Sequence, residues 1–451
     1  MNADVLVAKK NPYTGGQNMT ARLFGKGKSW VAVAALLLAS STAFAADEPK
    51  ISAGDTSFIL VSAALVMLMT PGLAFFYGGM VRRKNVLATV MHSFVAVAII
   101  SLQWVLWGYS LAFGPDFKGV IGSLAWFGLR GVGTAPYPAY SATIPHQAYM
   151  IYQCMFAIIT PALISGAMAE RMNFKAYVLF LLLWATFVYD PVAHWVWGDG
   201  GWLKRLGALD FAGGTVVHLI SGVTALIAAL MLGRRKGFPT EPIMPHNLPF
   251  TILGAAILWF GWFGFNAGSA LAAGELSATA FVATNTAAAA AAVTWMMLDW
   301  IFYKKPTVLG TASGAVAGLV AITPAAGFVS PLSAIAIGIL GGVACRQMVL
   351  WRTRRGIDDS LDAFGIHGVG GTTGALATGI FATVGATGLL LGNFKQFGIQ
   401  AVAVLATAAY AVVVGFIILK ALDLTVGLRV CDRDEIEGLD LSQHGEAGYT
   451  D

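Results

Sequence analysis

Charged side chains are scarce in this chain: Lys, Arg, Asp and Glu together make up 11% of its 451 residues. Cysteine is also rare, and the three residues Cys154, Cys345 and Cys431 form no spaced set of the kind that disulfide frameworks or zinc sites use. Apolar residues are abundant instead, at 57% of the chain, with a mean hydropathy of +0.71. A soluble domain of this length does not need such a composition, which is typical of a membrane protein.

The few charges and polar groups also exclude several functions. The net charge of +5 comes from basic residues spread through the loops, so no nucleic-acid-binding surface is predicted. No nucleophile–base pair and no set of metal ligands appears, and the histidines in apolar segments have apolar neighbours. We therefore expect neither an enzyme nor a bound cofactor.

The first 45 residues have the features of a cleaved signal peptide. Basic residues between positions 22 and 28 precede a short apolar core at 30–38, and Ala43-Phe44-Ala45 supplies the small–x–small pattern of a cleavage site. An extra membrane span is the alternative, but the apolar core is shorter than the roughly 20 residues that a span needs. The stretch before Arg22 is long for a signal peptide, so Met19 is a second candidate for the start.

The rest of the chain contains eleven apolar segments of membrane-spanning character, at 57–80, 86–113, 147–169, 176–197, 210–232, 248–270, 277–302, 307–328, 332–350, 362–385 and 397–421. An odd number of spans places the two ends on opposite sides. One set of alternate loops, together with the tail, carries most of the Lys and Arg, which predicts a cytoplasmic C-terminus and an external mature N-terminus. The sequence thus predicts an all-α membrane protein with a transmembrane domain at 46–422 and a cytoplasmic tail at 423–451, in the inner (plasma) membrane.

Two histidines lie inside glycine-rich apolar segments. His218 follows Gly213-Gly214-Thr-Val-Val, and His367 is followed by Gly368-Val-Gly-Gly. An ionisable side chain within a bilayer is costly, so it usually faces a protein cavity and marks a pathway. The alternatives are two separate core histidines bonded to backbone, or a metal site, for which these segments lack a third ligand.

The same two segments suggest an internal repeat. Asp210-Phe-Ala-Gly opens the fifth segment and leads to His218, and Asp362-Ala-Phe-Gly opens the tenth and leads to His367. The fifth segment runs inward and the tenth outward, as two inverted five-helix repeats plus an eleventh helix would give. Both aspartates are candidates for helix capping, and Asp210 has the alternative role of a negative charge that favours cation entry.

The strings Asp210-Phe-Ala-Gly-Gly-Thr-Val-Val-His218, Gly261-Trp-Phe-Gly-Phe-Asn-Ala-Gly-Ser269 and Phe364-Gly-Ile-His-Gly-Val-Gly-Gly371 closely resemble the bacterial ammonium transporter (Amt) family. Shorter strings at 76–79, 245–249 and 423–430 resemble it too, in the same order along nearly all the mature chain. The resemblance implies a homotrimer of eleven-helix protomers, each with its own narrow pore.

The resemblance also assigns residues. It implies an external ammonium site with Trp197, Ser269, Phe156, Tyr152 and Asp210, a gate of stacked Phe156 and Phe265, and the paired pore imidazoles His218 and His367. Family members often have phenylalanine at the position of Tyr152, so the added hydroxyl is a departure that bears on affinity.

Chemistry favours ammonia over ammonium inside such a pore. Moving a bare cation into an apolar lumen costs on the order of tens of kcal/mol by Born reckoning, whereas neutral ammonia costs far less. We therefore expect ammonium, and possible analogues such as methylammonium, to be deprotonated near the entrance, with coupled proton transfer. The alternatives are an ammonium sensor and a neutral gas channel of the related Rhesus type. The resemblance adds a PII-type regulatory protein at the cytoplasmic face and surrounding membrane lipids as partners.

Overall fold

The computed structural model describes residues 50–449, so the predicted signal peptide lies outside the described residues. A helix covers each of the eleven predicted segments. The spans are α2 (Ala53–Met80), α3–η2–α4 (Val86–Phe113), α5 (His146–Met168), α6–η4–α7 (Phe174–Trp197), η5–α9 (Gly214–Leu232), α10–η6 (Leu248–Ala267), α11 (Glu275–Tyr303), α12 (Val308–Ile322), α13 (Pro331–Arg354), η7–α14 (Phe364–Phe381) and α15 (Phe394–Thr425). Within residues 50–449, nine helices are long and apolar enough to cross a membrane.

The two remaining helices, α12 and η7–α14, are shorter than the other nine. All but three residues of α12 are buried by neighbouring helices. The expected all-α membrane architecture is confirmed.

Smaller elements connect these helices. They are β1 (Asp116–Phe117), which pairs antiparallel with β2 (Ile121–Gly122), the 3-10 turns η1 (Arg83–Asn85), η3 (Leu124–Leu129) and η8 (Leu389–Leu391), and the short helices α8 (Trp202–Leu206), α16 (Asp432–Glu437) and α17 (Leu439–His444). Five of the eleven spans contain a π-helical turn, and two of those turns carry the histidines: His218 lies in η5 (Gly214–Leu219) and His367 in η7 (Phe364–Gly368). Such turns are rare and occur frequently at functional sites.

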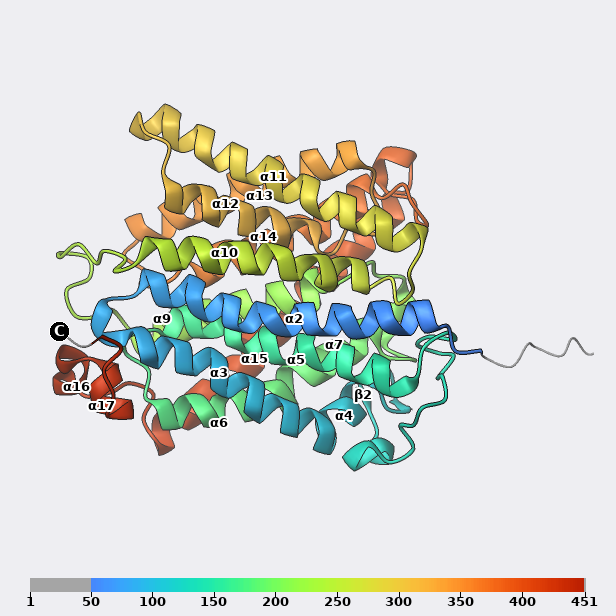
Figure 1. Cartoon of the computed structure of the whole chain (residues 1–451), viewed down its shortest axis with the longest axis horizontal. Coiled ribbons are helices and arrows are strands. Elements are labelled where there is room, and N and C mark those ends of the chain that lie inside the picture. The colour runs from blue at the N-terminus through green and yellow to red at the C-terminus, as the bar shows by residue number, and fades with distance from the viewer. Residues whose placement is uncertain (1–49, 450–451) are drawn as a thin grey trace, which may run out of the picture. The chain divides into compact units, whose positions relative to one another are not determined.

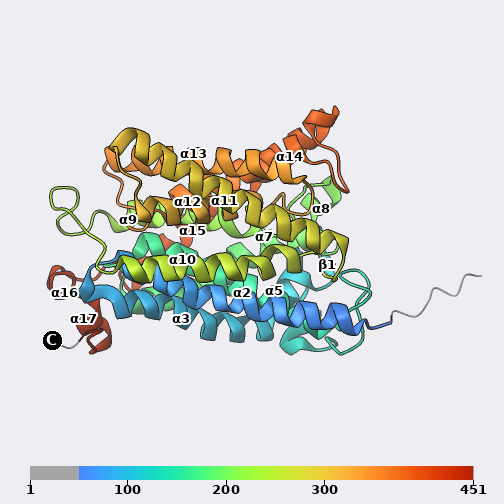
Figure 2. The same cartoon turned by 45° about the horizontal axis from the view of Figure 1, so that its top comes forward.

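The long helices lie side by side in a bundle, as Figures 1 and 2 show from two directions. α2 packs along α10, and α11 packs against α12 and α13. Outer helices present large apolar side chains, such as Phe94 and Leu405, that are about 70% exposed, which fits a surface facing lipid. α5 is enclosed by its neighbours, with 94% of its span buried, so it lies at the centre of the bundle.

The two histidine-bearing helices cross at a pair of glycines. A Cβ added at Gly222 of α9 would lie 2.0 Å from the backbone nitrogen of Gly368 in η7. Only glycine permits this approach, because any side chain here would collide with the facing backbone. Small residues allow such close contact between helices in membrane proteins. The end of α9 also lies beside the start of η7, since Arg235 bonds to Asp358. The two helices therefore run in opposite directions, as the inverted repeat requires.

The predicted partner of Asp210 in this repeat is wrong by three residues. Asp359, not Asp362, caps the second histidine helix, since its carboxylate accepts from the backbone N–H groups of Ala363 (3.1 Å) and Phe364 (2.8 Å). Asp362 instead has a left-handed backbone (φ +62°) and accepts a hydrogen bond from Arg352 Nε at 2.6 Å. The spacing agrees with this correction, because Asp210 and Asp359 each precede their histidine by eight positions.

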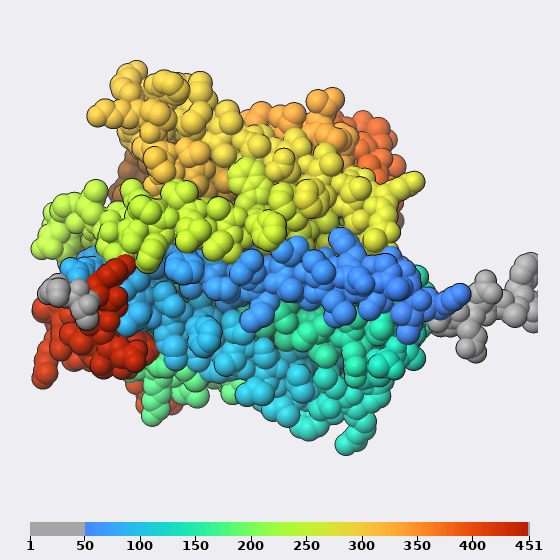
Figure 3. Space-filling view, in the orientation of Figure 1, coloured from blue at the N-terminus to red at the C-terminus, as the bar shows by residue number. Residues whose placement is uncertain are grey.

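The C-terminal residues fold back onto the bundle. α15 continues to Thr425, past the expected boundary at 422, and α16 and α17 follow. Asp440 Oδ1 accepts from the backbone N–H of Ala88 (2.8 Å), and Asn85 Oδ1 accepts from that of Leu439 (2.8 Å). Figure 3 shows this red segment against the blue start of α3, at the opposite end of the bundle from the beginning of α2.

Candidate functional site

Three cavities follow one another along the bundle, and the middle one is lined by residues of α2, α5, α10, α12 and the two histidine helices. The first, called here the Trp197 cavity, has a volume of about 180 Å³. Its lining includes aromatic rings and polar groups from Tyr140, Gln153, Phe156, Trp197, Lys204 and Ser269. Trp197 is fixed by a hydrogen bond from its indole Nε1 to the carbonyl oxygen of Asp210 (2.9 Å). Ser269 donates to the carbonyl oxygen of Phe265 (2.9 Å), which leaves its oxygen free to accept.

Tyr152 does not line this cavity. Its ring is fully buried, and its hydroxyl lies within hydrogen-bond distance of the carbonyl oxygens of Phe265 (2.9 Å) and Gly264 (3.0 Å) and of Ser269 Oγ (3.2 Å). A phenylalanine could make none of these contacts. This hydroxyl therefore ties α5 to η6 behind the cavity.

Asp210 is a helix cap in this structure. Its Oδ1 accepts from the backbone N–H groups of Gly213 (2.9 Å) and Gly214 (2.6 Å), and its Oδ2 accepts from those of Thr215 (2.8 Å) and Val216 (3.3 Å) and from the Thr215 hydroxyl. The side chain is 8% exposed. With both oxygens committed to the start of η5, the carboxylate has little capacity left to bind a cation directly.

Two phenylalanines separate the Trp197 cavity from the second cavity. The ring of Phe156 lines the first and that of Phe265 lines the second, with their centroids 4.3 Å apart and their planes at 36°. Both side chains are almost completely buried. Passage between the cavities therefore requires at least one ring to move.

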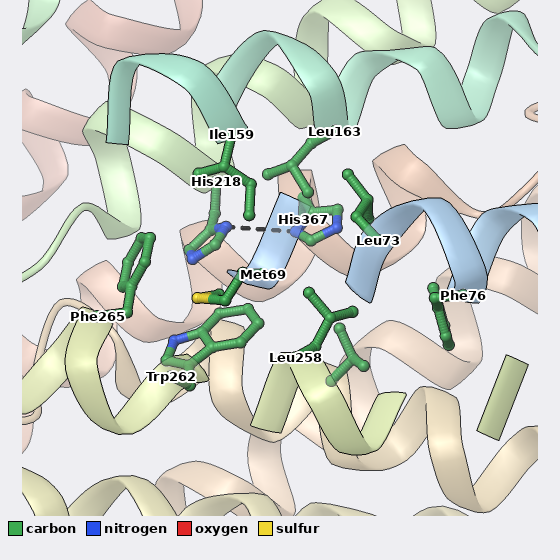
Figure 4. A pocket seen from close by; sticks show the side chains of 11 residues that line it. Met69, Leu73, Phe76, Ile159, Leu163, His218, Leu258, Trp262, Phe265 and His367 are labelled. Atoms are coloured by element: carbon green, nitrogen blue, oxygen red, sulfur yellow. Dashed lines mark hydrogen bonds between the residues drawn. The ribbon is translucent and has the colours of Figure 1, made fainter. Parts of the chain in front are cut away.

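The second cavity, called here the histidine lumen, is narrow and apolar apart from two imidazoles. Its free space is about 10 Å³, roughly enough for one molecule of the size of water. The Nδ1 atoms of His218 and His367 lie 3.3 Å apart, and their rings are nearly parallel at 20°. Figure 4 shows Phe265 and Trp262 beside His218, and Leu73 and Phe76 beyond His367.

The hydrogen-bond pattern of the pair fixes part of its chemistry. A contact between two Nδ1 atoms needs one donor and one acceptor, so at least one imidazole is neutral. His218 Nε2 is buried and has no hydrogen-bond partner among the described residues. An unsatisfied buried nitrogen is costly unless something supplies a partner, and a small molecule in the lumen is placed to do so.

The third cavity, called here the Asp299 cavity, continues the line past Phe76. Phe76 of α2 and Val316 of α12 line the histidine lumen, and Met80 and Ser313, about one turn further along the same two helices, line the Asp299 cavity. This cavity has a volume of about 350 Å³. Asp299, an acidic residue within an apolar run, pairs here with Arg346 (Oδ1 to Nε, 2.8 Å), and both are almost fully buried. The charge of Asp299 is therefore balanced locally, as burial requires.

The structure brings together Trp197, Ser269, Phe156, Phe265, His218 and His367 along one path, and it places Tyr152 and Asp210 in supporting positions. Five further residues line or support this path and were not predicted from the sequence: Trp262, Tyr140, Lys204, Arg346 and Asp359. Of these, only Asp359 had a usable signal, the eight-residue spacing to its histidine. In the part of the chain that the structure describes, no cluster of three or more His, Cys, Asp or Glu could hold a metal ion.

Comparisons with known proteins agree with this geometry. The family described as the Ammonium Transporter Family matches residues 57–449. An ammonium transporter of Bacillus subtilis is 55% identical over 404 residues, which cover 88% of this chain and 99% of that protein. Ammonium transporter Amt1 of Archaeoglobus fulgidus is 50% identical over 402 residues, which cover 88% of this chain and all of that protein.

Solved structures agree as well. Saccharomyces cerevisiae Mep2 superposes with a TM-score of 0.80 at 39% identity, covering 85% of this chain and 89% of that one. A protein described as Sensor Amt Protein superposes with a TM-score of 0.81 at 31% identity, covering 87% and 98%. The fold and its aligned cavities define a multi-pass helical membrane protein of the transporter class. The chain belongs to the ammonium transporter family.

Proposed function

We propose that this protein transports ammonium across a membrane by taking up the ion in the Trp197 cavity, removing a proton, and passing ammonia through the histidine lumen to the Asp299 cavity. The observation that carries the proposal is the 3.3 Å contact between His218 and His367 in a lumen whose other lining residues are apolar or aromatic. The relatives named ammonium transporter support the choice of substrate.

The Trp197 cavity suits a weakly held cation. A cation over an aromatic face gains roughly 0.5–2 kcal/mol, depending on how far it is desolvated. Trp197 and Phe156 offer such faces, and the Ser269 hydroxyl can accept one hydrogen bond. These contacts are enough to recruit ammonium and too few to trap it. Methylammonium offers the same N–H groups and is the natural analogue.

The lumen selects by acidity rather than by diameter. An intact cation loses its hydration there and gains only two imidazoles in return, so its entry is strongly unfavourable. Ammonium can lose a proton and continue as neutral ammonia, whereas potassium has no proton to lose. The Phe156–Phe265 pair keeps bulk water out of the lumen while it is closed.

The released proton can follow the imidazoles. His218 Nε2 is the unpartnered acceptor nearest the Phe265 side, and a proton taken there allows His218 Nδ1 to donate to His367 Nδ1. His367 then loses a proton from Nε2 toward the Asp299 cavity. Each turnover divides ammonium into ammonia and one proton and recombines them, so the transport carries charge.

The proposal also includes the orientation of the protein in the membrane, its assembly and a regulatory partner. The Trp197 cavity faces outside and the Asp299 cavity faces the cytoplasm of an inner-membrane protein whose mature N-terminus is external and whose C-terminus is cytoplasmic. The basic loops at the C-terminal end favour this orientation. A homotrimer is proposed as the assembly, and a PII-type protein as a regulator at the cytoplasmic end.

A sensor is the second candidate, because a solved structure described as a sensor Amt protein has the same fold. A sensor binds ammonium but passes little of it, and a Rhesus-type gas channel passes ammonia without charge. The three functions therefore differ in what crosses the membrane.

Current recording on a solid-supported membrane tests the proposal. Wild-type protein in proteoliposomes should give transient currents with ammonium and none with potassium. His218→Ala, His367→Ala and the double variant should lose the proton-coupled current or change its selectivity, while size-exclusion profiles stay like wild type.

The alternatives have distinct outcomes. A sensor gives no ammonium current, and a gas channel gives internal alkalinisation without current. Wild-type ammonium currents in the double histidine variant would overturn the proposed route.

A further inference from the structure

Lys204 brings an ammonium group of its own to the rim of the Trp197 cavity. This residue lies on α8, between Trp197 and Asp210 in the chain, and its side chain is exposed. Its Nζ donates to the carbonyl oxygen of Trp197 at 3.1 Å and lies 5.7 Å from the centroid of the Tyr140 ring. Tyr140 and Trp197 both line the cavity, so Lys204 occupies part of its rim.

Lys204 also lines a separate cavity of about 500 Å³ on the outer side, together with Asp116, Asp199 and Arg205. Of the residues that line these two cavities, Lys204 is the one they share. An ion that moves from the outer cavity into the Trp197 cavity therefore passes this side chain.

The contacts of Lys204 are of the same kind as those that the Trp197 cavity offers to a substrate. A primary alkylammonium group is a mono-substituted ammonium ion with three N–H donors. An aromatic face and an oxygen acceptor are the two partners that Lys204 already uses. An incoming ammonium ion competes for the same kind of contact and is also repelled by a like charge, which weakens its binding.

The neighbouring charged residues do not fully neutralise the charge of Lys204. Arg205 Nη2 pairs with Asp116 Oδ2 (3.0 Å), and Asp116 also bonds to His194 Nε2 (2.9 Å), so the charge of Arg205 is balanced within the outer loops. Asp199 lines the outer cavity with Lys204 and partly offsets its charge. Asp210 is committed to capping η5.

We propose that Lys204 is a tethered competitor of the substrate, which lowers the affinity of the Trp197 cavity for ammonium and restricts the size of the ammonium ions that it admits. The inference rests on the proposed function, because it needs the Trp197 cavity to be the site of recruitment. It assigns a specificity-determining role to a residue outside the aromatic and histidine positions.

The test compares apparent affinities in the same current recordings, with ammonium and methylammonium at low and high sodium chloride. Lys204→Met removes the charge and keeps the length, so it should raise the apparent affinity for ammonium about threefold to tenfold. The gain should be larger for methylammonium, which needs more room, and smaller at high salt, which screens the charge. Lys204→Gln provides a second neutral variant should the first fold poorly.

Two controls separate charge from structure. Lys204→Arg keeps a cation that can donate to the Trp197 carbonyl, and it should stay within twofold of wild type. Arg205→Gln removes an adjacent cation that points to Asp116, and it should also stay within twofold. Unchanged or weaker affinity in both neutral variants would overturn the inference, as would an arginine variant that behaves like the neutral ones.

A further variant distinguishes this failure from failure of the proposed function. Ser269→Ala removes a polar group of the Trp197 cavity itself and should weaken ammonium binding. If Ser269→Ala has an effect and the neutral Lys204 variants have none, only the role of Lys204 is wrong. If neither has an effect, recruitment in the Trp197 cavity is wrong and the role of Lys204 falls with it.

Discussion

Two aspartates, Asp210 and Asp359, hold the starts of the two histidine helices. Each carboxylate is buried and accepts hydrogen bonds from backbone N–H groups of the first helical turn. These N–H groups have no partner within the helix, and the bilayer core offers them no acceptor. A negative charge at a helix start also complements the helix dipole. At the scale of single residues, these caps fix the position at which each histidine-bearing helix begins.

Replacing Asp210 with Asn should therefore destabilise the protein. Asp210 accepts through both oxygens, and an Asn side chain would turn an NH₂ group toward N–H donors on one side. We expect a loss of about 2–4 kcal/mol, from at least one charged hydrogen bond and an unsatisfied donor. Thermal unfolding in detergent measures it as a lower melting temperature.

The same variant separates the two roles considered for Asp210. Asp55→Asn, which changes an aspartate in α2 away from the cavities, is the control. A variant that keeps its melting temperature but loses ammonium affinity would contradict the capping role and favour a direct electrostatic one.

At the scale of elements, the approach of α9 and η7 brings His218 to His367. The histidines come from helices that run in opposite directions and cross where Gly222 meets Gly368. Close backbone contact of this kind sets the relative position of the two π-helical turns. The 3.3 Å contact of the imidazoles is thus a consequence of glycine at the crossing.

Gly222→Val should push the two helices apart. The added Cβ would meet backbone atoms of Gly368, which cannot move like the end of a flexible side chain. We expect lower yield of folded protein and loss of ammonium current in whatever folds. Gly398→Ala is the matched control, because a Cβ at this exposed helical position has nothing within 4 Å.

The control should be neutral or stabilising by up to about 1 kcal/mol, since Ala favours helix over Gly. Normal currents from a well-folded Gly222→Val variant would mean that the histidine contact tolerates a shift of the helices.

At the scale of the whole molecule, ion pairs link the loops at the C-terminal end. Arg235 pairs with Asp358 (2.8 Å) and Glu170 (3.5 Å), and Glu435 of α16 accepts from Arg429 (2.6 Å). The Arg235–Asp358 pair connects the loop after α9 to the start of η7. Glu435 also accepts from the backbone N–H of Lys236 (2.6 Å), which connects the tail to the loop after α9. Burial would raise the pKa of the Asp358 carboxyl, but hydrogen bonds and charge from Arg235 outweigh it and hold that pKa below its usual range.

Asp358→Asn should cost about 3–5 kcal/mol near neutral pH, because it leaves Arg235 buried beside a neutral group. A carboxyl with a lowered pKa in the folded state stabilises the protein above its unfolded pKa of about 3.9, and this stabilisation is lost as the pH falls through the lower folded value. The difference in melting temperature between variant and wild type should therefore shrink below about pH 4.

Melting curves between pH 3 and 8 measure this difference, with Asp432→Asn as the control for an exposed tail carboxylate. A melting-temperature difference between Asp358→Asn and wild type that stays constant down to pH 3 would show that the Arg235–Asp358 ion pair does not provide this stability.

Several features follow from the sequence alone, because they depend on local patterns. The apolar segments predicted the positions of all eleven helices. Each membrane span must satisfy its backbone N–H and C=O groups within its own helix, so a local pattern is enough to find it. The strings around His218, Phe265 and His367 identified the family, and the family match confirms it. The isolated Asp299 had no explanation at this level, because its partner Arg346 lies 47 positions away.

Only the tertiary structure decided which residues meet. Asp359 rather than Asp362 caps the second histidine helix because the turn at Asp362 points its carboxylate to Arg352 instead. Tyr152 lies behind the Trp197 cavity because its hydroxyl finds backbone carbonyls of η6. Lys204 reaches the rim because its ammonium group bonds to the Trp197 carbonyl and lies near the Tyr140 ring. The contacts of Tyr152 with η6 and of Lys204 with Tyr140 join segments that are far apart in the chain, and a linear pattern does not contain such distances. The contacts of Asp359 and Asp362 are local, but they depend on the left-handed backbone at Asp362, which the sequence pattern did not predict.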